Sequence, residues 1–139
     1  MGYAINQVAG EFFLAAEDFD SAIAAAKTIG SAATHDYVLE FRNLENLEEI
    51  LSAWRFQAEF DETGNITELW FTGENAGDQE VILTAIAPWV GDGSYLQIAG
   101  EDGSQWRYQF SDGQMETKQA SINFDWELNT LAQTQIFPR

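Results

Sequence analysis

The chain has 139 residues, of which 45% are hydrophobic and 14% are aromatic, and it contains no cysteine. This composition excludes a disordered chain, which lacks the apolar surface needed to offset its ordering entropy, and it excludes disulfides, thiolate zinc sites and cysteine nucleophiles. The formal net charge is −17, from 23 acidic and six scattered basic residues, so direct binding to nucleic acid or to an anionic membrane is not expected.

The beginning of the chain predicts a cytoplasmic protein. Its first residues carry no basic cluster, and the longest early apolar run, residues 12–16, is flanked by Glu11 and Glu17. Such a run is too short for a signal peptide and far too short for a membrane span. No Pro-rich or Ser-rich linker interrupts the sequence, so we expect one domain over residues 1–139.

The first third of the chain predicts a strand, a helix and a second strand. Residues 10–16 are apolar enough for a buried strand. Residues 18–30 form a helical pattern that begins at Asp18 as N-cap and ends at Gly30, with an apolar face made by Phe19, Ala22, Ile23, Ala26 and Ile29. Residues 37–42 alternate between apolar and polar side chains, which is typical of a strand.

The middle of the chain predicts a helix, a hairpin and another helix. Asn43 is expected to cap a helix whose apolar stripe is Leu44, Leu47, Leu51 and Trp54. The alternating runs 56–60 and 66–71 flank the turn residues 61–65, which predicts a β-hairpin. Asp78 is expected to cap a third helix that ends near Pro88.

The last third predicts a meander of three strands. Residues 94–100 form the first strand, Asp-Gly turns at residues 102–103 and 112–113 end the first and second strands, and the third strand runs to about Asp125. Residues 126–139 have only weak periodicity. Together these elements predict an α+β fold with a single, mostly antiparallel sheet, made of the hairpin and the meander, and about three helices packed on one of its faces.

No catalytic, cofactor or metal site is predicted. His35, the only histidine, lies beside Asp36, but neighbouring residues usually point apart, so it is interpreted as a loop histidine. The paired carboxylates lie at predicted helix starts or turns, where acidic residues have local roles. They are Asp18 with Asp20, Glu48 with Glu49, Asp61 with Glu62, and Glu101 with Asp102. The glycine-containing turns do not have the spacing of a calcium loop or a phosphate loop.

One strand carries aromatic residues on a single face. Trp106, Tyr108 and Phe110 alternate with polar residues, and Tyr95 is expected nearby. This face is interpreted chiefly as core, with a weaker hypothesis that Tyr95, Trp106, Arg107 and Tyr108 form a ligand or partner surface, since Trp, Tyr and Arg dominate interface hot spots. Arg107, on the opposite face, is expected to be displayed or to pair with an acidic residue.

Residues 54–110 resemble a family of small, uncharacterised bacterial proteins. The resemblance rests on the pattern 100–110, Gly-Glu-Asp-Gly followed by Trp106, Arg107, Tyr108 and Phe110, with Gly73, Gly77 and Pro88 before it. It implies a fold pattern and no activity.

Three functions follow as hypotheses. The favoured one is a small acidic protein-interaction module, of the inhibitor, immunity or adaptor type, that binds a basic partner protein, because the charge is high and no catalytic constellation is present. The first alternative is a small-molecule-binding domain that uses the aromatic sheet face. The second is an enzyme that uses carboxylates and His35.

Overall fold

The computed structural model describes residues 3–29 and 45–120, and within them the fold is α+β. The three α-helices described are α1 (Phe19–Ala26), α3 (Leu47–Ala53) and α4 (Gln79–Ile86), and short 3-10 helices cover Ala16–Asp18 and Ala87–Trp89. The strands described are β1 (Ile5–Glu11), β2 (Phe56–Phe60), β3 (Ile66–Phe71), β4 (Tyr95–Gly100), β5 (Gln105–Ser111) and β6 (Gln114–Gln119). None of the helices described is long and apolar enough to cross a lipid bilayer.

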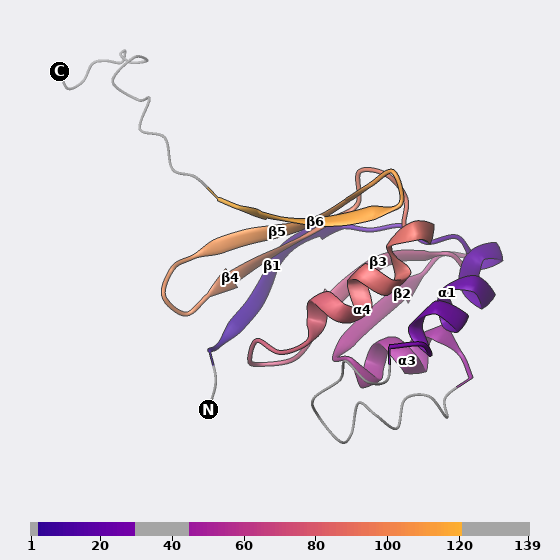
Figure 1. The fold of residues 1–139 in the computed structure, drawn as a ribbon, viewed down its shortest axis with the longest axis horizontal. Coiled ribbons are helices and arrows are strands. Elements are labelled where there is room, and N and C mark those ends of the chain that lie inside the picture. Colours follow the sequence, from indigo (N-terminus) through magenta and orange to yellow (C-terminus); the bar gives the residue numbers. More distant parts are fainter. Residues whose placement is uncertain (1–2, 30–44, 121–139) are drawn as a thin grey trace, which may run out of the picture.

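The described strands form two antiparallel sheets, so the prediction of one sheet is wrong in this respect. The larger sheet has the order β1-β4-β5-β6, and the smaller one is the hairpin β2-β3. All three helices lie on one side of the larger sheet (Figure 1), where α1 packs against both α3 and α4. The hairpin and the meander are confirmed, but the N-terminal strand β1, rather than the hairpin, is the fourth strand of the meander's sheet.

The two sheets meet along a seam between β1 and β3. At one end, Leu14 exchanges two backbone hydrogen bonds of 3.0 Å with Ile66, at the start of β3. At the other end, the amide of Ile5 donates to the carbonyl of Glu74 at 3.1 Å, just beyond β3. Backbone pairing is therefore present at both ends of the seam, and a side chain fills the middle.

The side chain of Gln7 takes the place of a backbone group in this seam. Its Oε1 accepts from the Phe71 amide at 2.8 Å, and its Nε2 donates to the Leu69 carbonyl at 3.0 Å. A β-bulge shifts the register of β1 between Gln7 and Ala9. This position of the Gln7 side chain also requires glycine at residue 10, because a Cβ on Gly10 would lie 2.8 Å from Nε2 of Gln7. In the middle of the seam, where β1 and β3 share no backbone hydrogen bonds, the buried side-chain amide of Gln7 therefore connects the two strands.

The first predicted strand lies earlier in the chain than expected. Residues 10–16 were predicted from their apolar character, whereas β1 begins at Ile5 and ends at Glu11. Beyond β1, Phe12 and Leu14 are buried but Phe13 is 42% exposed. The apolar run therefore marks the crossing from one sheet to the other, and the strand itself is built from the mixed sequence before it.

The predicted helices are confirmed with adjusted ends. Asp18 precedes α1 without a capping hydrogen bond from its side chain. The side chain of Asn46 caps α3, accepting from the Glu49 amide at 2.8 Å, and the cap predicted at Asn43 lies outside the described residues. So do the helix end predicted at Gly30, the strand at 37–42, His35 with Asp36, and everything predicted after residue 120.

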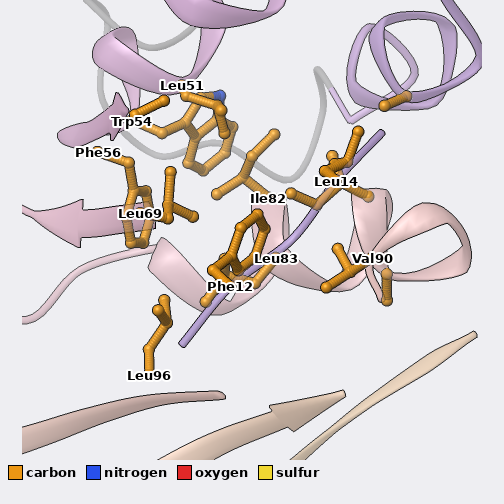
Figure 2. Packing of buried hydrophobic residues seen from close by; sticks show 14 of the residues in the cluster. Phe12, Leu14, Leu51, Trp54, Phe56, Leu69, Ile82, Leu83, Val90 and Leu96 are labelled. Carbon is orange, nitrogen blue, oxygen red and sulfur yellow. The ribbon is translucent and has the colours of Figure 1, made fainter. Parts of the chain in front are cut away.

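In the described part of the chain, a cluster of buried apolar side chains lies between the helices and both sheets. Figure 2 shows Phe12, Leu14, Leu51, Trp54, Phe56, Leu69, Ile82, Leu83, Val90 and Leu96 packed around one another. Residues of the helices, the hairpin and the larger sheet contribute to it, as does the segment of residues 12–15 between β1 and the first 3-10 helix, which we call the crossing segment. The stripes predicted on α1 and α3 belong to this cluster: Ala22, Ala26, Leu47, Leu51 and Trp54 are buried.

Candidate functional site

The four residues predicted as a ligand or partner surface lie on two different faces of the larger sheet. Tyr108 and Trp106 point toward the helices, and Tyr95 and Arg107 point to the opposite face, because side chains alternate along a strand. The structure thus pairs Tyr95 with Arg107 and separates both from Tyr108.

The inward pair belongs to the core. Tyr108 is 1% exposed, and its hydroxyl oxygen accepts a hydrogen bond from Nε2 of Gln79 at 3.2 Å. Burial raises the pKa of Tyr108, since the ionised phenolate would lose its hydration. Trp106 is half-buried and stacks on Tyr3, with ring centroids 6.5 Å apart. This aromatic face is occupied by the protein's own side chains, as the core interpretation requires.

The outward pair forms a polar platform. The Arg107 guanidinium carbon lies 4.2 Å from the centroid of the Tyr95 ring, and its Nε donates to Oε1 of Gln97 at 2.8 Å. Gln97 in turn donates to Oε1 of Gln105 at 2.8 Å. A shallow depression of about 290 Å³ lies beside Arg107. The Arg107 cation is thus already engaged by Tyr95 and Gln97, and four glutamines, Lys118 and Trp106 are among the residues that line the depression.

A larger groove lies where the chain crosses between the sheets. It has a volume of about 570 Å³ and is lined by residues from the end of β1, the crossing segment, β3 and the loop before β4. The lining residues are Gly10, Glu11, Phe12, Phe13, Thr67, Glu68, Trp70, Asp92, Gly93 and Ser94. We call this the crossing groove.

Two hydrogen bonds fix the backbone of Phe13, one through its amide and one through its carbonyl. The Phe13 amide donates to Oγ of Ser94 at 3.1 Å, and its carbonyl accepts from the Gly91 amide at 2.8 Å. Leu14 is held against Ile66 as described above. With the backbone fixed and its neighbours Phe12 and Leu14 directed into the core, Phe13 is directed outward into the groove.

The crossing groove combines apolar and negatively charged groups. Phe13 and Trp70 are 42% and 36% exposed, and they are two of the four large apolar side chains exposed in the described part of the chain. Glu11, Glu68 and Asp92 line the same groove, and Oδ1 of Asp92 accepts from the Asp112 amide at 2.9 Å. No lysine or arginine of residues 3–29 and 45–120 lines it. Trp70 donates from Nε1 to Glu68 at 3.1 Å, which orients both side chains.

Other carboxylates are engaged in local structure. Oδ2 of Asp61 accepts from Nδ2 of Asn65 at 3.1 Å, and its Oδ1 accepts from the amides of Asn65 and Thr63 at 2.9 and 3.0 Å, in the turn of the hairpin. These hydrogen bonds, with that from the Asn65 side chain the largest cause, hold the pKa of Asp61 below its ordinary value. Asp102 accepts from the Tyr3 hydroxyl, which lowers the pKa of Asp102 and raises that of Tyr3. Within the two described ranges, no group of three or more His, Asp or Glu side chains could hold a metal ion.

No family model, no curated protein and no solved structure matches this chain. The resemblance of residues 54–110 to small uncharacterised bacterial proteins therefore stays a prediction. The crossing groove is not predicted from the sequence, because the apolar character of residues 10–16 places Phe12 and Phe13 together in a buried strand, and no pattern marks Trp70. The sequence feature that could have indicated it is the Phe-Phe pair, since strand alternation buries one of two neighbours and exposes the other.

Proposed function

We propose that this chain is an acidic protein-interaction module, of the inhibitor, immunity or adaptor type, and that it binds a basic segment of a partner protein in the crossing groove. The observation that carries the proposal is the composition of that groove. Two exposed aromatic residues and three acidic residues line it, with no lysine or arginine among its described lining residues.

The chemistry of the groove supports a partner rich in arginine or lysine. A guanidinium group can form paired hydrogen bonds with a carboxylate and stack on an aromatic ring at the same time. Phe13 and Trp70 also offer apolar contact to neighbouring side chains of the partner. The net charge of −17 would attract such a partner over longer distances and repel acidic competitors.

A test uses a short synthetic peptide of alternating arginine and leucine as the probe, followed by nuclear magnetic resonance of the full chain. We expect chemical shifts to change at Thr67, Trp70 and Ser94, and the affinity to fall between about 0.05 M and about 0.5 M salt as the charges are screened. The control peptide, alternating glutamate and leucine, should not bind.

Two matched double variants separate the groove from general electrostatic attraction. Neutralising two groove carboxylates in Glu11→Gln/Glu68→Gln should weaken peptide binding by on the order of tenfold. The control Glu45→Gln/Glu62→Gln changes the net charge equally at two exposed positions outside the groove, and it should have little effect. Equal losses in both variants, or shifts spread over all acidic surfaces, would contradict the proposal.

A further inference from the structure

Among the strands that the structure describes, β6 is an edge of the larger sheet and pairs only with β5 (gold in Figure 1). The Ala120 amide donates to the Gln105 carbonyl at 3.0 Å, and this fixes which backbone groups point inward. Because hydrogen bonding alternates along an antiparallel pair, the groups of residues 114, 116 and 118 face β5, and those of Met115, Thr117 and Gln119 point away from it.

Opposite charges flank Thr117 on β6. Glu116 precedes Thr117 and Lys118 follows it, and both side chains lie on the outer face of the sheet. Their side chains are 66% and 58% exposed, and Nζ of Lys118 lies 3.7 Å from Oε1 of Glu116. An exposed pair of this kind contributes little within one chain, so its charges are available to another strand.

We propose that a second copy of this chain pairs with β6 in antiparallel fashion, with the two-fold axis at Thr117. Thr117 would face Thr117 of the other copy, and Met115 would face Gln119. These are the three residues whose backbone groups point outward, so every outward N–H and C=O from Met115 to Gln119 finds a partner. The two four-stranded sheets would become one continuous sheet of eight strands.

The same register pairs the charges. It places Glu116 of each copy directly opposite Lys118 of the other, twice across the axis. These residues form the pairs without mutual hydrogen bonds, in which opposing side chains lie closest and opposite charges stabilise. An axis at Met115 would run the pairing into the turn at Asp112 and Gly113, and an axis at Gln119 would leave most of β6 unpaired.

This self-complementarity selects a second copy over an unrelated strand. A symmetric dimer requires a surface that complements itself under a two-fold rotation, and the sequence Glu116-Thr117-Lys118 meets this condition in charge and in backbone geometry. The proposal is independent of the crossing groove, whose described lining residues come from β1, β3 and two connecting segments and include none from β6.

The test measures the mass of the full chain by sedimentation equilibrium at about 0.15 M salt, where the repulsion between two acidic chains is largely screened. We expect the average mass to rise from one chain to two as the concentration increases. Lys118→Glu creates two pairs of facing glutamates and should weaken the dimer by on the order of tenfold. Lys27→Glu, at the end of α1, changes the net charge equally and should leave the dimer unchanged.

Two further variants complete the test. The exchange Glu116→Lys/Lys118→Glu keeps the pairing and should restore the dimer. Thr117→Pro removes an amide that points away from β5, so it should abolish the dimer while the fold, monitored by circular dichroism, is kept. A chain that stays monomeric at every concentration would overturn the proposal, as would a dimer that Lys118→Glu and Lys27→Glu weaken equally.

Discussion

Replacing Gln7 tests whether one buried amide holds the two sheets together. The side chain is 8% exposed, and it satisfies the Leu69 carbonyl and the Phe71 amide at 3.0 and 2.8 Å. Gln7→Leu keeps a similar volume but leaves both backbone groups without this partner. Leaving a polar group unsatisfied in a buried site costs about 1–3 kcal/mol, so the two together should lower the free energy of unfolding by about 2–5 kcal/mol.

This loss is large for a chain of this size, whose total stability is expected to be about 5–15 kcal/mol. Urea unfolding followed by tryptophan fluorescence measures it directly, since the chain has five Trp residues. The matched control is Asn6→Thr, which changes the exposed neighbour of Gln7 and should alter stability by less than about 0.5 kcal/mol.

Gln7→Glu adds a pH readout to the same site. The ionised carboxylate that this substitution introduces can accept from the Phe71 amide but faces the Leu69 carbonyl, so its folded pKa should lie above its unfolded value. The variant should therefore be least stable near neutral pH and approach the wild type as pH falls and the carboxyl protonates. A Gln7→Leu variant within about 0.5 kcal/mol of the wild type would refute the reasoning, because apolar packing alone would then hold the seam.

Three further predictions concern the core, the groove and the hairpin turn. Tyr108→Phe should cost about 1–2 kcal/mol because it removes the acceptor of Gln79, whereas Tyr95→Phe on the outer face should be nearly neutral in the same urea titration. Phe12→Ala should lower stability by about 3–5 kcal/mol and Phe13→Ala by much less; equal losses in thermal unfolding would contradict the roles inferred from their exposures of 4% and 42%. The pKa of Asp61 is lowered by its hydrogen bonds in the folded state, so its contribution is present above the unfolded pKa and is lost as pH falls through the folded pKa. Asp61→Asn should accordingly be less stable than the wild type at about pH 7, with the difference shrinking toward about pH 3 in urea titrations; a difference that does not depend on pH would count against this role.

Local patterns in the sequence predicted most elements of the fold. The hairpin and the meander follow from alternation flanked by turn residues, and the turns contain the positive-φ residues Gly64, Gly103, Asp112 and Gly113. The helices follow from apolar stripes that are buried in the structure. These features depend on residues close together in the chain, which is why sequence alone specifies them.

The division into two sheets could not be predicted in this way. It depends on β1 pairing with the distant strand β4 while the hairpin stays separate. Gln7 then connects the two sheets through Leu69 and Phe71, and a glutamine in a mixed segment indicates nothing about such a contact. The crossing groove was missed for a related reason. Phe13 is exposed because Ser94 and Gly91 fix its backbone, and that constraint comes from a distant part of the sequence.

The position of β1 also determines the order in which the protein can be completed on the ribosome. The hairpin and the meander pair between near neighbours, so both can form soon after they are synthesised. By contrast, Ile5 pairs with Gly100 and Glu11 with Tyr95, so β1 cannot pair until β4, which follows it by more than 80 residues, has been synthesised. Until β4 has been synthesised, the backbone groups of β1 that pair with it are exposed in the nascent chain. An unpaired strand of this kind is prone to aggregate, so we expect chaperone binding to matter most in this interval.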